Sequence, residues 1–180
     1  MSTISSEDKQ ALFHRMKVWR TECDFQADQF ELLGNEATIV PHRIEMAATY
    51  FIVAAGCVYY HAKEIFEDKL GTTKGRKHLD DIIAADPDLQ AIIDRRNWLN
   101  HGAVSSTKGP RGDNPYKLAK HHHLSIQTSF DTGQSKTIKY SIGWLGSDTN
   151  SYKDMTDWHT KARTSLDRLL TDTALLTPGI

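Results

Sequence analysis

The residues best suited to chemistry in this 180-residue chain lie together in the segment IDRRNWLNHG, residues 93–102. The segment contains two arginines, two asparagines and one histidine, namely Arg95, Arg96, Asn97, Asn100 and His101. Histidine transfers protons near neutral pH, and arginine binds phosphate oxygens through two parallel hydrogen bonds. These groups suit cleavage of RNA without metal, in which the 2′-OH attacks, histidine moves a proton and arginine stabilises the crowded phosphate.

The segment should form the end of a helix over residues 86–101. Asp86 is a good N-cap, and Pro87 suits the first helical position. The apolar stripe of this helix consists of Leu89, Ile92, Ile93 and Leu99. At about 100° per residue, Arg96 and Asn100 fall in the middle of that stripe, whereas Asn97 and His101 share its margin.

A guanidinium on an apolar stripe needs a partner or a polar cleft, because a buried unpaired charge costs several kcal/mol. One interpretation is structural: Arg96 and Asn100 pair with Glu45 or Glu64, and His101 only caps the helix. The other is a functional site that opens at the end of the helix. The sequence leaves both open.

The hexapeptide RNWLNH, residues 96–101, resembles the Arg-x4-His motif of HEPN domains, which commonly carry an asparagine directly after the arginine. The resemblance implies an up-down helical bundle with the motif near the end of its third main helix. It also implies a homodimer in which two motifs form one composite site. Arg96 and His101 would be catalytic and Asn97 would position them, while Arg95 fits the family's looser spacing.

The same resemblance implies a metal-independent endoribonuclease that leaves 2′,3′-cyclic phosphate and 5′-OH ends. It would be a toxin or a defence effector, with RNA as substrate and an antitoxin or regulatory protein as a further partner. Some HEPN proteins are not catalytic, so the alternative is an interaction or nucleotide-sensing module. We expect no cofactor and no metal.

Two basic segments flank the helix in sequence, KGRKH before it and TKGPRG after it. We expect both to be loops that line a phosphate track beside Arg96, the alternative being ordinary solvated loops. The candidate RNA-binding residues are Arg95, Asn100, Lys74, Arg76, Lys77, Lys108 and Arg111.

The histidine run at residues 121–123 offers a His-x-His pair, because alternate residues of a strand face the same way. His121 and His123 suit zinc, but a catalytic zinc site needs a third ligand that the sequence does not identify. Histidines on an exposed edge strand, or in contact with RNA, are the other interpretations.

Apolar periodicity predicts the rest of the frame. The expected helices lie at about residues 5–34, 41–70, 80–84, 86–101 and 151–170. The apolar stripe of the first consists of Leu12, Met16, Trp19, Cys23, Phe30 and Leu33, interrupted only at Gln26. The stripe of the second consists of Ile44, Ala48, Phe51, Ala55, Val58, Ala62 and Ile65, and that of the last of Tyr152, Met155, His159, Ala162, Leu166 and Leu169. The segment GTTKGRK, residues 71–77, reads as a loop, and small residues of the second helix, Gly56 among them, would permit close helix approach. Strict alternation predicts a β-hairpin inserted at about residues 120–146. The whole chain, residues 1–180, should form one mainly α domain.

Composition excludes several classes of protein. A net charge of −1 gives no global basic field, so any RNA site must be local. Cys23 and Cys57 lie in apolar helical patterns, which suggests a reducing compartment such as the cytoplasm. The longest uncharged run, residues 46–60, is too short for a membrane span, and the first ten residues do not resemble a secretion signal. We expect the exposed part of the third main helix, with Trp98, to mediate dimerisation.

Overall fold

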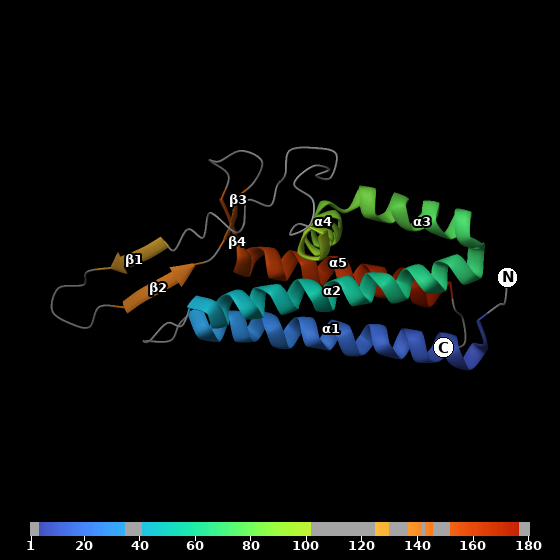
Figure 1. Ribbon diagram of the computed structural model, residues 1–180, viewed down its shortest axis with the longest axis horizontal. Coiled ribbons are helices and arrows are strands. Elements are labelled where there is room, and N and C mark those ends of the chain that lie inside the picture. Colours follow the sequence, from blue (N-terminus) through green and yellow to red (C-terminus); the bar gives the residue numbers. More distant parts are fainter. Residues whose placement is uncertain are drawn as a thin grey trace.

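The computed structural model describes residues 4–34, 41–101, 125–129, 137–141, 143–145 and 152–176. Only the backbone is described in the strands and at residues 34, 41, 42, 44, 45, 98–101, 155 and 156. Helices make up most of the described residues, so the chain is mainly α as predicted (Figure 1). None of these helices combines the length and the hydropathy that a membrane span requires.

Two long antiparallel helices, α1 (Ser6–Gly34) and α2 (Pro41–Leu70), form the base of the bundle (Figure 1). The Ser5 hydroxyl caps α1 by accepting the backbone N–H of Asp8 at 3.1 Å. Lys9, near the start of α1, pairs with Asp68, near the end of α2, at 2.7 Å. This pair fixes the antiparallel register of the two helices.

The last helix, α5 (Met155–Leu175), runs beside α1 and α2, whereas α4 (Pro87–His101) is seen almost end-on and crosses them (Figure 1). Arg20 of α1 holds α5 through two hydrogen bonds to Asp167, at 2.8 and 2.9 Å. The expected up-down order therefore describes α1 and α2 but not α4.

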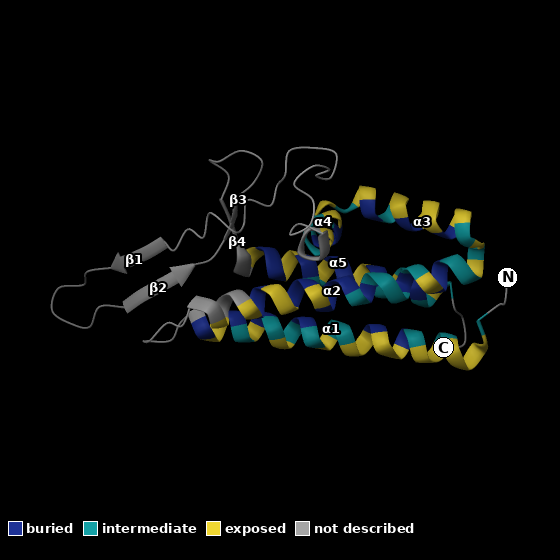
Figure 2. Ribbon diagram, in the orientation of Figure 1, coloured by how far each residue is buried: buried dark blue, intermediate teal, exposed yellow. Residues whose placement is uncertain are grey.

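The core lies where α1, α2 and α5 meet, and Figure 2 shows their buried residues along these contacts. The predicted α1 stripe is confirmed at Met16, Cys23, Phe30 and Leu33. Gln26, its polar interruption, is partly buried and donates a hydrogen bond to Glu22 at 2.7 Å. The predicted α2 stripe is confirmed at Ala48, Phe51, Ala55, Val58, Ala62 and Ile65.

The loop predicted for residues 71–77 is wrong. Helix α3 (Thr72–Ala85) begins directly after Gly71, whose φ of 83° suits glycine, and includes the KGRKH segment. Gly75 is buried, and a Cβ there would lie 2.4 Å from the backbone oxygen of Phe66 on α2. This glycine therefore permits close helix packing, although in the sequence it resembles a loop signal.

Helix α5 begins about four residues later and ends about five residues later than predicted. Tyr152, expected on its apolar face, belongs instead to a strand. The end of the helix contains threonines that suggest a loop, but Thr171 and Thr173 donate to the carbonyl oxygens of Asp167 and Leu169, at 2.9 and 2.7 Å. Both hydroxyls are therefore satisfied within the helix.

Two antiparallel strand pairs occur before α5: β1 (Ser125–Ser129) with β2 (Thr137–Ser141), and β3 (Gly143–Leu145) with β4 (Tyr152–Asp154). In the first pair Thr128 lies opposite Ile138. The connection between β1 and β2 lies outside the described residues, so the hairpin insertion stays a prediction.

Candidate functional site

Helix α4 is fixed at its start by Asp86, as the sequence predicted. One carboxylate oxygen of Asp86 accepts the backbone N–H groups of Asp88 and Leu89, each at 3.1 Å. The same oxygen accepts the hydroxyl of Ser165 on α5 at 2.9 Å. This single side chain therefore caps α4 and ties it to α5.

The apolar stripe of α4 is confirmed at Leu89, Ile92 and Ile93, all of which are buried. Arg96, one turn further along, continues the stripe but is only half-buried. The core therefore ends at Arg96, and its guanidinium lies where α4 crosses α2.

Tyr60 on α2 holds the Arg96 guanidinium in two ways. The guanidinium carbon lies 4.0 Å from the centroid of the Tyr60 ring, and Nη1 of Arg96 donates a hydrogen bond to the Tyr60 hydroxyl. A cation over an aromatic face is attracted by the ring's electron density. Both contacts fix the direction of the guanidinium while leaving its positive charge uncompensated.

Gly56, one turn before Tyr60, provides the space for the Arg96 side chain. A Cβ at position 56 would lie 2.6 Å from Cγ of Arg96 and 3.2 Å from its Cδ. The expectation that small residues of α2 permit close helix approach is therefore confirmed at this residue.

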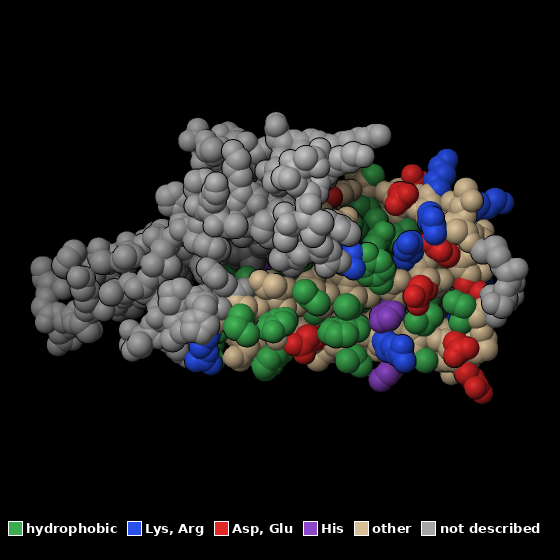
Figure 3. Space-filling view, viewed as in Figure 1, with side chains coloured by type: hydrophobic (Ala, Val, Ile, Leu, Met, Phe, Trp, Pro, Cys, Tyr) green, Lys and Arg blue, Asp and Glu red, His purple; other side chains and the backbone are tan. Residues whose placement is uncertain are grey.

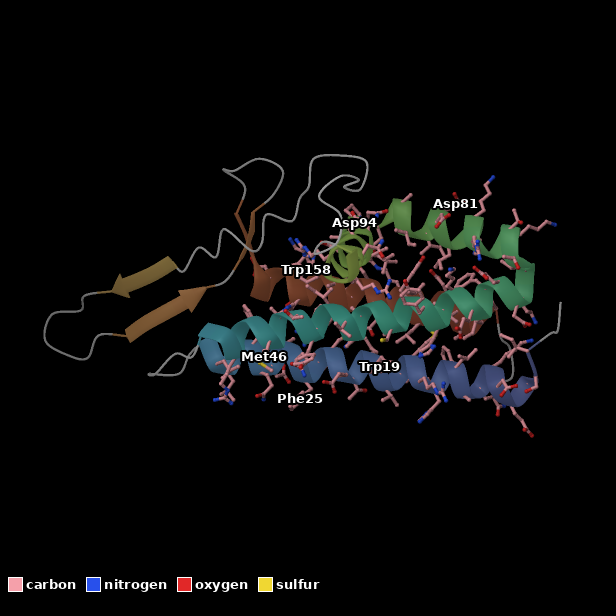
Figure 4. All side chains as sticks on the ribbon, viewed as in Figure 1. Trp19, Phe25, Met46, Asp81, Asp94 and Trp158 are labelled. Atoms are coloured by element: carbon pink, nitrogen blue, oxygen red, sulfur yellow. The ribbon has the colours of Figure 1, made fainter. Side chains whose placement is uncertain are left out.

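The two adjacent arginines of the motif point to different helices. The guanidinium carbon of Arg95 lies 4.1 Å from the ring centroid of Trp158 on α5, whereas Arg96 lies on α2. Figure 4 shows Trp158 in the first part of α5, beside α4. The site centred on Arg96 therefore does not include the Arg95 guanidinium.

Asn97 is exposed, and its side-chain oxygen accepts a hydrogen bond from Nη1 of Arg96 at 3.4 Å. Asn100 and His101 lie in the last turn of α4, but their side chains are outside the described residues. The side chains of Trp98, expected at a dimer interface, and of Leu99, expected on the apolar stripe, are outside them as well, so these expectations stay predictions. Arg96 and Asn97 are thus brought together, one turn before His101.

The structural interpretation required a carboxylate beside Arg96. Glu64 lies 3.9 Å from His61, and among the side chains that the structure describes Arg96 forms no ion pair. The side chain of Glu45 is outside the described residues. Within the described part of the chain, Arg96 thus keeps a net positive charge that could bind an anion.

The basic residues of α3 are exposed, and Arg76 pairs with a glutamate of α2 rather than lying beside Arg96. Nε of Arg76 donates to Glu67 at 2.6 Å, and Glu67 lies about 10 Å along α2 from Tyr60. Lys74 and Lys77 lie on the same helix. Lys108, Arg111 and the His121–His123 pair lie outside the described residues.

The structure adds three α2 residues that the sequence analysis did not assign to the site: Tyr59, Tyr60 and Cys57. Burial raises the pKa of Cys57, and the nearby charge of Arg96 opposes this shift. Burial and the neighbouring Asp80 raise the pKa of Tyr59, whose ring meets Tyr60 edge-to-face at 5.3 Å. Both groups therefore stay protonated at neutral pH, and neither is a ready nucleophile.

In the described residues no group of three or more His, Cys, Asp or Glu side chains is arranged to hold a metal ion. The chemistry that this part of the chain can supply is anion binding by Arg96. Comparison with protein-family models, with curated proteins and with solved structures gives no match for this chain.

Proposed function

We propose that this protein is a metal-independent endoribonuclease of the HEPN type. It would cleave RNA by attack of the 2′-OH, leaving a 2′,3′-cyclic phosphate and a 5′-OH. The observation that carries the proposal is the Arg96 guanidinium, which Tyr60 and Gly56 hold in place and which has no carboxylate partner among the described side chains. Such a cation is suited to a phosphate in its transition state.

In this mechanism Arg96 binds the phosphate, His101 transfers protons and Asn97 orients the guanidinium. Transfer of one proton from the nucleophile and another to the leaving group usually requires two groups. A homodimer would supply the second histidine, which is why we propose a composite site. Arg95, Asn100, Lys74, Arg76, Lys77, Lys108 and Arg111 remain the proposed further contacts to RNA.

The proposed setting is the cytoplasm, where a toxin or defence effector would meet RNA and an antitoxin or regulatory protein. The two free thiols fit a reducing compartment, since Cys23 is buried and Cys57 half-buried. We also propose that a β-hairpin is inserted before α5 as a family-specific feature.

RNA cleavage by the purified protein in EDTA tests the proposal. Arg96→Ala and His101→Ala should each abolish cleavage and toxicity, and His101→Ala should keep the helical circular-dichroism spectrum of the wild type. Cleavage by His101→Ala at the wild-type rate would sink the nuclease function. Activity that EDTA removes and zinc restores would point instead to His121 and His123.

The second candidate is an interaction or nucleotide-sensing module without catalysis. It is favoured by the exposed apolar side chains of α1 and α2, since a binding module needs such a surface. A module of this kind would bind a partner protein or a nucleotide without producing cyclic-phosphate ends, and its expression would not be toxic.

A further inference from the structure

Helix α2 carries two apolar stripes, and the second one faces outward. It consists of Met46, Tyr50, Val53, Cys57 and Tyr60, and we call it the outer seam. Met46, Tyr50 and Val53 are 48%, 50% and 40% exposed, and Cys57 and Tyr60 are half-buried. The core stripe, from Ala48 to Ile65, lies on the opposite side of the helix. The core stripe packs α2 against the rest of the core, whereas Tyr60, at one end of the outer seam, contacts Arg96 of α4.

Figure 3 shows hydrophobic side chains gathered on the visible face over α1 and α2, and Figure 4 labels Met46 and Phe25 among them. The outer seam has spacings of four, three, four and three residues. This is the heptad spacing with which two helices pack knobs into holes. The seam is therefore suited to contact with another helix.

The outer seam is also nearly symmetric about Val53. Met46 and Tyr60 lie seven residues to either side, and Tyr50 and Cys57 lie three and four residues away. Beyond the two ends lie exposed charges of opposite sign, Arg43 and Glu64. Antiparallel pairing about Val53 brings Arg43 within one residue of Glu64 of the second copy, whereas Lys63, the exact counterpart of Arg43, is paired with Glu67 of its own helix at 3.7 Å.

We propose that two copies of the chain pack through the outer seam, with α2 antiparallel to α2 and the two-fold axis at Val53. Val53 would meet Val53, Tyr50 would meet Cys57, and Arg43 would reach Glu64 of the second copy. Such a contact is isologous, so one self-complementary patch closes the dimer.

The outer face of α1 offers a weaker contact, although Val18, Phe25 and Leu32 are also exposed. A two-fold axis at Phe25 would place Glu22 of one copy against Asp28 of the other. This repulsion between like charges disfavours α1 and favours α2 as the surface for self-association.

The outer-seam dimer does not depend on the proposed function. Only its role in RNA cleavage rests on that proposal. Arg96 packs on Gly56 and Tyr60, so α2 pairing brings two copies of this site together. Gly56 and its copy would be about 9 Å apart along the helix axis. Two Arg96 side chains could then act on one RNA strand, as the composite site requires.

Sedimentation equilibrium of the full chain tests the surface directly. The wild type should have about twice the monomer mass of 20.4 kDa at micromolar concentration. Val53→Glu should weaken dimerisation at least about 100-fold, because two carboxylates would meet at the axis. Tyr50→Glu is an independent second variant. Val18→Glu, the same substitution at an exposed valine of α1, is the control and should leave dimerisation unchanged. A wild type that is monomeric at 100 μM, or equal losses in the Val53 and Val18 variants, would overturn the proposal.

A charge exchange tests the antiparallel register. Arg43→Glu and Glu64→Arg should each weaken the dimer about 10-fold, since each change places like charges together at both ends. The double variant should return to within about threefold of the wild type, because the pairs are restored with reversed sign. If the double variant loses as much dimerisation free energy as the two single variants together, this register is wrong.

RNA cleavage by the same variants separates the surface from the function. If the wild type is a dimer that Val53→Glu dissociates, but the wild type does not cleave RNA, the dimer surface is supported and the nuclease function is refuted. Monomeric Val53→Glu that cuts RNA at full specific activity keeps the nuclease and removes the shared site.

Discussion

Gly56 and Arg96 approach each other so closely that position 56 has no room for a side chain. A Cβ there would lie 2.6 Å from Cγ of Arg96. Glycine inside a helix costs about 1 kcal/mol relative to alanine. Gly56 nevertheless lies in the middle of the 30-residue helix α2, at the point where Arg96 packs on it. The position of Arg96 is therefore built into α2 as well as into α4.

Gly56→Ala should reduce RNA cleavage at least about 10-fold while changing the melting temperature by no more than a few degrees. The added methyl group displaces Arg96, but the gain in helix propensity offsets the lost contact. Steady-state cleavage and a thermal melt measure the two effects.

Gly75→Ala is the matched control. Its Cβ would meet the backbone of Phe66 at 2.4 Å, and backbone cannot move aside as a side chain can. This variant should lose stability by about 1–3 kcal/mol through overpacking. If Gly56→Ala cleaves RNA at the wild-type rate, or melts as low as Gly75→Ala, position 56 does not serve Arg96.

Tyr60 should act as a positioning residue for Arg96. Tyr60→Phe keeps the ring under the guanidinium and loses the hydrogen bond, so cleavage should fall about threefold to 10-fold. Tyr60→Leu removes both contacts and should lower cleavage about 100-fold, mainly in kcat, because displacing the cation removes more transition-state stabilisation than RNA-binding energy. Equal rates for the Phe and Leu variants would show that the ring does not orient the guanidinium.

The helix that carries the site could be predicted from local signals, because its cap and its stripe lie within one short segment. Asp86, Leu89 and Ile92 behave as the sequence suggested. The second half of α3 was predicted as a short helix at residues 80–84, but its first half was missed because Gly71 and Gly75 resemble loop signals. Only the packing against α2 shows that Gly75 lies inside a helix. The close approach at Gly75 leaves no periodic signal in the sequence of α3.

The partner of Arg96 could not be predicted in the same way. Tyr60 lies 36 residues before Arg96 and on the outer seam of α2, so nothing in its spacing assigns it to Arg96. The crossing of α4 over α2 decides which α2 residues meet Arg96, and that crossing depends on loop lengths and core volumes. The different directions of Arg95 and Arg96 follow from the same crossing.

Asp86→Ala should destabilise the protein by about 2 kcal/mol, since it removes the α4 cap and the hydrogen bond from Ser165. Asp86→Asn should retain most of the stability, because asparagine caps helices as well as aspartate does. Urea unfolding at pH 7 measures both variants. Asp88→Ala, two residues further along the chain and inside α4, is the control and should cost under about 1 kcal/mol. Equal losses for Asp86→Ala and Asp88→Ala would contradict the capping role.

His159 should make the fold sensitive to mild acid. It is 2% exposed, its ring lies 4.2 Å from that of Phe51, and its Nε2 has no hydrogen-bond partner among the described residues. Burial lowers the pKa of His159 to about 3, and the nearby charges of Arg163 and Arg95 add to this effect. The folded protein therefore holds this histidine neutral through the mildly acidic range.

Below about pH 6.5 the unfolded chain takes up a proton at His159 that the folded chain refuses, so stability falls as the pH falls. The slope from this one group is about 1.4 kcal/mol per pH unit, or about 2 kcal/mol between pH 6.5 and pH 5. His159→Leu should remove that slope, because leucine does not titrate, while exposed His14→Leu should leave it unchanged. Urea unfolding at several pH values measures the free energy of unfolding of all three proteins. Parallel curves for the wild type and His159→Leu over this range would show that His159 is not held neutral in the core.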